Sequence, residues 1–233
     1  MKSSFSIIVR AKTLRPVFCI GCGVLLLLLA AAVPSRADEP AISFTGTTVN
    51  GTTGAFSLGF EFTTNNAIDV SALGYYNASL NGGDSSFQNG TCDCGEVGIF
   101  NAGGTLLAST TVTGADPVNG FFNYASIPTL ALAAGQTYFI AAETGTSDYT
   151  GSLNTGFTTG FSVSPDINYI TDSYIDSTTL AFPNASEGLT AADGGGEFGP
   201  NFAETAVPEP SSLPLLGTGL LALVAAIRRK LLV

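Results

Sequence analysis

The side chains of residues 38–206 that could do chemistry are carboxylates, hydroxyls and two cysteines. All eight Lys and Arg residues lie at positions 2–36 and 228–230, and the chain has no His. Of the 18 Asp and Glu residues only Glu209 lies beyond this stretch, so residues 38–206 hold 17 acids and a formal charge of −17. No His or Lys base, Schiff-base lysine, Ser-His-Asp or Cys-His arrangement can be built here. The lack of any cation also argues against nucleic-acid binding.

The two cysteines of this stretch, Cys92 and Cys94, are separated by one residue. In an oxidising compartment a disulfide across Asp93 would close a small, strained ring and pin the loop around it. An intermolecular disulfide and a pair of free thiols, metal-binding ones included, are the alternatives. A zinc site is disfavoured because no His or second Cys pair completes the ligand shell.

The carboxylates could bind calcium, because hard divalent cations prefer several carboxylate and carbonyl oxygens. None of the candidates has the spacing of an EF-hand loop, and solvated loop acids are the alternative. Calcium is therefore the one cofactor that the sequence leaves open. The weak candidate ligands are Asp84, Asp166, Asp172 and Asp176.

Catalysis and sugar binding have weaker support. Glycoside hydrolysis formally needs only two carboxylates, such as Glu143 and Asp148, but any other pair among the 17 acids would serve as well. We therefore expect no catalytic residues and no enzymatic activity. Exposed tyrosines could stack on sugar rings, although the absence of Trp weakens that case, and the alternative is that most of them belong to the core. These tyrosines are Tyr75, Tyr76, Tyr149, Tyr169 and Tyr174.

Short apolar runs between turn residues predict an all-β fold. Apolar residues alternate from Phe56 to Phe62, which indicates one buried and one solvated strand face. Asn101 followed by Gly103–Gly104 predicts a tight hairpin turn, and 133–135 another connection. Residues 154–202 show less regular patterning. The spacing favours a jelly-roll-like β-sandwich, and the further expected strands are 68–76, 96–100, 105–112, 121–127 and 137–142.

Part of this region also resembles the β-sandwich modules of exported bacterial proteins. The residues that carry the likeness are the run from Glu96 to Val112 and the run from Leu130 to Phe139. Many such modules have no known function, and some similar sandwiches bind carbohydrate. The resemblance spans roughly residues 56–143 and supports the fold more than the function.

The first 37 residues have the parts of a secretory signal peptide in the usual order. Four basic residues precede an apolar stretch that contains five leucines, Leu25 to Leu29. Ser35 and Ala37 then supply small residues at positions −3 and −1, which predicts a signal helix cleaved after Ala37.

The C-terminal residues form three consecutive elements. Pro208-Glu209-Pro210 is followed by an apolar segment, Ser211 to Ile227, and then by Arg228, Arg229 and Lys230. As a helix the 17-residue segment would be roughly 25 Å long, at the short end for a membrane span, and basic residues after it favour a cytoplasmic end.

This arrangement resembles the PEP-CTERM sorting signal. The resemblance implies that an exosortase recognises Pro208, Glu209 and Pro210 and removes the tail after a transient insertion of the transmembrane helix into the inner membrane. An ordinary C-terminal membrane anchor with a chance Pro-Glu-Pro is the alternative. The predicted domains are thus a signal peptide (1–37), an acidic β-sandwich (38–206) and a sorting signal (207–233).

We therefore expect an exported envelope or extracellular-matrix protein with a non-catalytic structural role, associated with exopolysaccharide. The alternative is a carbohydrate-binding module, with or without assistance from calcium. The expected partners are the exosortase, the secretion machinery and an extracellular polysaccharide, and not nucleic acid.

Overall fold

Alternating side chains in β5 (Phe56–Thr64) separate a buried face from a partly open one. Leu58, Phe60 and Phe62 are almost completely buried, while Glu61 is half-buried on the opposite face. This period of two is the expected consequence of a pleated strand with a core on one side. The computed structural model describes residues 38–47, 50–51, 55–81, 94–145, 149–150, 158–194, 196, 198–207 and 219.

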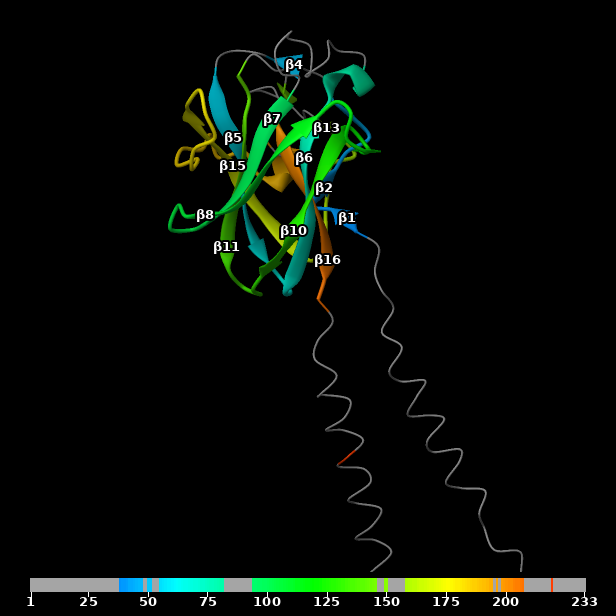
Figure 1. Cartoon of the computed structure of the whole chain (residues 1–233), viewed down its shortest axis with the longest axis vertical. Coiled ribbons are helices and arrows are strands. Elements are labelled where there is room, and N and C mark those ends of the chain that lie inside the picture. Colours follow the sequence, from blue (N-terminus) through cyan, green and yellow to red (C-terminus); the bar gives the residue numbers. More distant parts are fainter. Residues whose placement is uncertain are drawn as a thin grey trace, which may run out of the picture. The chain divides into compact units, whose positions relative to one another are not determined.

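Two five-stranded antiparallel sheets contain the long strands (Figure 1). The sheet that contains β5, called the β5 sheet, has the order β15-β5-β11-β7-β8. The sheet that contains β6, called the β6 sheet, has the order β1-β16-β6-β10-β9. Besides β5, the bounds are β1 (Glu39–Pro40), β6 (Ile68–Tyr76), β7 (Cys94–Asn101), β8 (Leu106–Thr113), β9 (Val118–Asn119), β10 (Phe122–Leu132), β11 (Thr137–Glu143), β15 (Ile167–Asp176) and β16 (Pro200–Ala206).

Shorter elements complete the described fold. Three two-stranded antiparallel pairs join β2 (Ile42–Ser43) to β14 (Ser162–Val163), β3 (Gly46–Thr47) to β13 (Thr158–Thr159) and β4 (Asn50–Gly51) to β12 (Tyr149–Thr150). Two short 3-10 helices, η1 (Ala78–Asn81) and η2 (Ala191–Asp193), lie in the connections.

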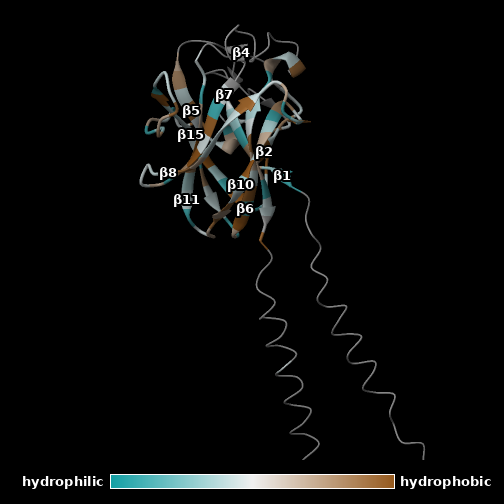
Figure 2. Ribbon diagram, viewed as in Figure 1, coloured by the Kyte–Doolittle hydropathy of each residue, from teal (hydrophilic) through white to brown (hydrophobic). Residues whose placement is uncertain are grey.

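The core lies between the two sheets, in a sandwich-like arrangement. The ring of Phe62 in the β5 sheet lies 4.9 Å, centroid to centroid, from that of Phe202 in the β6 sheet. Phe60, Leu73 and Tyr75 are fully buried in the same cluster. Figure 2 shows hydrophobic and hydrophilic residues interspersed along the strands of both sheets, as strands with one buried face require.

Most of the strands expected from the sequence are confirmed. The strand at 68–76 has the expected bounds, and the other expected strands differ by a few residues at their ends, the largest extension being that of β10 to Leu132. The hairpin turn is also confirmed, because Asn101 Oδ1 accepts hydrogen bonds from the amides of Gly103 and Thr105 at 3.0 Å. Residues 154–202, whose sequence patterning is less regular, contain β15 and the start of β16.

The two described ends of the body lie on neighbouring strands. Glu39 in β1 is paired with Glu204 in β16, so Asp38 and Val207 lie near the same edge of the β6 sheet. The Asp38 carboxylate accepts hydrogen bonds from Ser71 (2.6 Å) and Thr205 (2.7 Å), which lower the pKa of Asp38. Within the described residues no helix is long and apolar enough to cross a membrane. The expected signal helix and transmembrane helix lie outside those residues.

Candidate functional site

Residues 177–189, called the crossing segment, run over the face of the β5 sheet that points away from the core. The segment starts after β15 and is bound to β5, where Ser57 Oγ donates to Ala181 O at 2.7 Å and accepts from Ala181 N at 3.1 Å. It then returns to β15, where the backbones of Tyr174 and Ala185 exchange hydrogen bonds of 2.8 and 3.0 Å. One segment therefore covers an otherwise solvated sheet face.

Aromatic contacts hold the middle of the crossing segment. The Phe182 ring packs edge-on against Phe139 of β11 and Phe100 of β7, with centroid distances of 4.9 and 5.8 Å. Leu180 lies over Gly98, where an added Cβ would come within 2.7 Å of Leu180 Cδ2. The glycine in β7 thus permits the close approach of the segment to the sheet.

Asp172 in β15 fixes the returning part of the crossing segment. Its Oδ1 accepts hydrogen bonds from Leu189 N at 2.8 Å and Ser186 Oγ at 3.0 Å, and its Oδ2 accepts one from Glu187 N at 2.9 Å. Thr171 Oγ1 donates a further hydrogen bond at 3.0 Å. Hydrogen bonds to an ionised acceptor are among the stronger ones, so this buried carboxylate is an anchor. Burial and the charge of Asp172 raise the pKa of Glu187.

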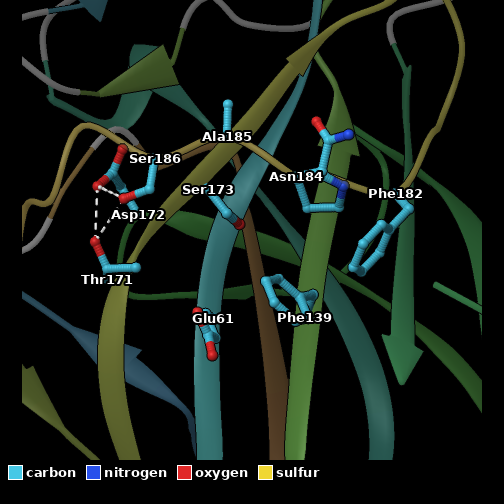
Figure 3. Close-up of a pocket in the computed structure, with 10 residues that line it drawn as sticks. Glu61, Phe139, Thr171, Asp172, Ser173, Phe182, Asn184, Ala185 and Ser186 are labelled. Atoms are coloured by element: carbon cyan, nitrogen blue, oxygen red, sulfur yellow. Dashed lines mark hydrogen bonds between the residues drawn. The ribbon is translucent and has the colours of Figure 1, made fainter. Parts of the chain in front are cut away.

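A pocket of about 250 Å³ remains between the crossing segment and the β5 sheet. Residues 182–186 of the segment line one wall, and residues 171–173 of β15 line another. Glu61 and Phe139 lie at paired positions of β5 and β11, and both point into the space (Figure 3). The lining therefore combines two carboxylates, two Phe rings, an amide and hydroxyls.

Several polar groups of this pocket are available for a ligand. Glu61 is half-buried and accepts no hydrogen bond from any residue that the structure describes. Ser173 is 3% exposed, and its Oγ has no partner in the described part of the chain. The Asn184 side chain is exposed at the rim. Buried polar groups are normally hydrogen-bonded, so this pocket has donors and acceptors that a bound molecule could use.

The proposed calcium ligands do not converge in the described structure. Asp166 accepts a hydrogen bond from Asn66 Nδ2 at 2.8 Å, Asp172 anchors the crossing segment, and Asp176 is exposed at the end of β15. Along a strand these aspartates are roughly 20 Å and 13 Å apart, too far to share one ion. The described residues contain no group of three or more metal-ligating side chains. Asp84 lies outside them, so calcium binding stays a prediction.

The tyrosines proposed to stack on sugars are mostly in the core. Tyr75 and Tyr76 are fully buried and Tyr169 is 5% exposed, so an exposed stacking role is wrong for these three. The alternative, that such residues form the core, is confirmed for them because they belong to the buried cluster between the sheets. Tyr174 is half-buried beside Phe56, and the side chain of Tyr149 lies outside the described residues.

The remaining predicted residues are only partly within the described structure. Glu143 is half-buried, and both desolvation and the nearby Glu96 raise the pKa of its carboxyl. Its proposed partner, Asp148, lies outside the described residues. So do Ala37, Cys92, the side chain of Cys94 and the sorting residues Pro208, Glu209, Pro210, Arg228, Arg229 and Lys230.

Sequence reasoning missed the pocket, although one signal of it was present. Phe139 occupies a position that alternates with buried Tyr138 and Ile140, so it lies on the outer face of β11. A large apolar side chain there indicates that another part of the chain covers the sheet. The covering residues, 182–186, lie in a stretch without period-two patterning, and nothing in their local sequence assigns them to β11.

Comparison with protein families assigns most of the β-sandwich region to a known family. Residues 44–191 match the family described as a domain of unknown function, DUF4082. The chain belongs to the DUF4082 family. The DUF4082 match includes all the residues that line the pocket.

The tail is assigned by a second family match. Residues 206–230 match the PEP-CTERM protein-sorting motif, so the sorting signal expected from the sequence is confirmed. This motif marks an exported protein that the exosortase machinery processes and sorts to the cell envelope. A search of the curated proteins and a search of the solved structures give no match.

Proposed function

We propose that this DUF4082 protein is a non-catalytic structural protein of the extracellular matrix, retained in exopolysaccharide after its tail is removed. The observation that carries the proposal is the sorting motif at residues 206–230, which directs the chain to the cell envelope. The proposed processing leaves a product that begins at Asp38, after signal cleavage at Ala37, and ends near Pro208-Glu209-Pro210. The apolar segment 211–227 spans the inner membrane only transiently.

The negative charge of residues 38–206 is compatible with an extracellular location and disfavours contact with anionic surfaces. Residues 38–206 contain 17 acids and no basic side chain. Self-repulsion of such a polyanion favours solubility and disfavours binding to nucleic acid and to anionic lipid. A hydrated polysaccharide imposes no such charge barrier when it is neutral or cationic.

A jelly-roll topology is part of this proposal. Numbered along the chain from one to eight, the strands β1, β5, β6, β7, β8, β10, β11 and β16 pair as one with eight, two with seven, three with six and four with five. This is the pairing of a long hairpin that has been rolled into two sheets, with β15 and β9 added at the edges. Jelly rolls occur in lectin and capsid domains, so the topology is compatible with both the structural and the binding role.

A carbohydrate-binding module is the second candidate function. It is favoured by the pocket on the outer face of the β5 sheet, where Phe139, Phe182 and Asn184 meet. Small-molecule sites usually combine aromatic walls with a few polar groups that fix orientation. A role in binding sugars and a role in the matrix are compatible, because binding is one means of retention.

Intact mass of the protein recovered from membrane, periplasm and medium tests the main proposal. A species that begins at Asp38 and ends near Pro210, found outside the inner membrane and co-purifying with polysaccharide, is the expected result. A chain that keeps residues 211–233 and stays in the inner membrane would contradict it. The variant Glu209→Ala should block processing, whereas Pro214→Ala, which changes a proline outside the Pro-Glu-Pro element, should leave it intact.

A further inference from the structure

We infer that the pocket beneath the crossing segment binds one amino-sugar unit of a polysaccharide, with the Glu61 carboxylate accepting hydrogen bonds from the ammonium group of the sugar. The ligand class is a hexosamine with a free amine, at a chain end or in a position that leaves one ring accessible. This inference rests on the proposed function, because it names the chemistry by which the processed protein is held in the matrix.

The size of the pocket fits a single ring. Its volume of about 250 Å³ lies just below the roughly 300–1,000 Å³ that is usual for drug-sized ligands. An oligosaccharide would extend beyond the walls formed by residues 182–186 and 171–173. The pocket therefore selects a unit and not a long segment of the polymer.

The two carboxylates of the pocket differ in what they can still bind. Asp172 already accepts four hydrogen bonds from the described chain. Glu61 accepts none from the described residues, although it is half-buried. A half-buried carboxylate gains most from a cation or from several donors, and no Lys, Arg or His exists between residues 38 and 206 to supply one. An ammonium group on the ligand provides that missing cation.

The aromatic walls favour a ligand in which an ammonium group is attached to a ring with apolar C–H groups. The Phe139 and Phe182 rings lie 4.9 Å apart, centroid to centroid, at an interplanar angle of 70°, and both line the pocket. Figure 3 shows Phe139 between Glu61 and Phe182. A cation near an aromatic face is attracted by the ring quadrupole, and the apolar C–H groups of a sugar ring can pack against these apolar side chains. The exposed Asn184 amide at the rim is available for the sugar hydroxyls.

Charge also excludes the opposite class of sugar. A uronate would place a third carboxylate beside Glu61 and Asp172, and no basic side chain in residues 38–206 could neutralise it. The formal charge of −17 extends the same preference to the approach of the polymer, since a polyanion attracts a cationic chain over long distances. Long-range attraction alone would be weakened by salt, whereas a partly buried contact in the pocket would be weakened much less.

Calorimetric titration of the full chain in detergent tests the inference, with methyl glycosides as probes. Methyl glucosaminide should bind with a dissociation constant on the order of 1 mM, as expected for one small unit. Methyl N-acetylglucosaminide should bind at least tenfold more weakly, and methyl glucuronide should not bind. Glu61→Gln should remove the preference for the amine, whereas Glu96→Gln, an equal charge change on the same sheet outside the pocket, should leave it unchanged.

Three results would overturn the inference. The first is equal binding of glucosaminide by Glu61→Gln and by the unchanged protein. The second is loss of all binding in 0.5 M salt, which would indicate polyelectrolyte attraction without a site. The third is equally tight binding of a lysine amide, which would indicate a peptide ligand.

Failure here is distinguishable from failure of the proposed function. A processed protein that co-purifies with polysaccharide but does not bind glucosaminide leaves the matrix role standing and removes this site. A protein that binds glucosaminide but remains unprocessed in the inner membrane supports this site and contradicts the proposed matrix role.

Discussion

The two faces of the β5 sheet are covered in different ways. On the inner face, Phe60 and Phe62 pack against a second sheet and are fully buried. On the outer face, a single crossing segment is held by Ser57, by Phe182 and by Asp172, and it leaves a pocket beneath it. Close packing on one side supplies stability, and incomplete cover on the other leaves space for a ligand. The two faces of the same strands therefore differ residue by residue in how closely they are packed.

The two carboxylates of the pocket, Asp172 and Glu61, also differ in how far the chain already satisfies them. Asp172 is 4% exposed and satisfied by donors from the chain, so it acts as a structural anchor. Glu61 is more open and has no such donors among the described residues. A carboxylate that is already satisfied has little to offer a ligand, whereas one without donors is suited to binding.

The largest effect should come from exchanging a ring on the inner face. Phe62→Ala should lower the free energy of unfolding by about 3–5 kcal/mol, because it leaves a cavity in the core. Phe182→Ala removes the same ring from the outer face, where it is half-buried, and should cost less than half as much. Urea denaturation measures both. Equal losses would show that the outer face is as important for stability as the core.

The anchoring carboxylate should have the next largest effect. Asp172→Ala should cost about 1–3 kcal/mol, because it leaves the part-buried amides of Glu187 and Leu189 without their acceptor. Asp176→Ala, at the exposed end of the same strand, should change the stability by less than about 0.5 kcal/mol. Hydrogen exchange should show faster exchange of the Glu187 and Leu189 amides in Asp172→Ala alone. Unchanged exchange there would contradict the role of Asp172 as an anchor.

The close approach of the crossing segment to β7 can be altered directly. Gly98→Val should displace Leu180 and cost about 1–2 kcal/mol through overpacking. Gly46→Ala is the control, because an added Cβ there meets nothing within 4 Å. In Gly98→Val, chymotrypsin should cleave the crossing segment near Leu180 and Phe182 faster than in the unchanged protein. In Gly46→Ala the cleavage rate should not change. Equal cleavage rates would mean that the segment does not depend on this contact.

The sequence predicted the inner face far better than the outer one. β5 alternates clearly from Phe56 to Phe62 and β6 alternates in its first half, and the positions of both strands were predicted to within two residues. β15 was missed because a register shift between Tyr169 and Thr171 interrupts its alternation, and because its second half is rich in polar residues. An edge strand that a loop covers has no simple two-sided pattern.

The pocket was harder to predict for a different reason. Glu61 and Phe182 are separated by 120 positions in the chain, and only the path of the crossing segment brings them to the same space. The sequence suggested Asp172 only as a weak calcium ligand, and in the structure its oxygens accept hydrogen bonds from Ser186 and from backbone amides. Composition identified the acids and the absence of cations, and only tertiary structure shows which acid is left open.

The smallest expected effect is the dependence of the folding stability on pH. It distinguishes acids whose pKa is raised in the folded state from acids whose pKa is lowered. Burial and neighbouring acids raise the pKa of Glu143 and of Glu187, so in weak acid these groups hold protons in the folded state that the unfolded chain has released. Their contribution to stability is therefore full below the ordinary glutamate value of 4.5 and is lost as the pH rises through the folded pKa. Hydrogen bonds lower the pKa of Asp38, whose contribution is present above its ordinary value of 3.8 and is lost as the pH falls.

The sum of these contributions places the maximum of stability in mild acid, at about pH 4–5, and not at neutral pH. Repulsion among the 17 acids of residues 38–206, a stretch without any basic side chain, acts in the same direction, because protonation relieves it. The thermal midpoint should therefore fall by a few degrees between pH 5 and pH 8, and 0.5 M salt should restore most of the loss at pH 8 by screening. Glu143→Gln should flatten the profile above pH 5, whereas Asp38→Asn should flatten it only on the acid side. A midpoint that rises steadily from pH 5 to pH 8 would contradict both the charge argument and the assignment of these two carboxylates.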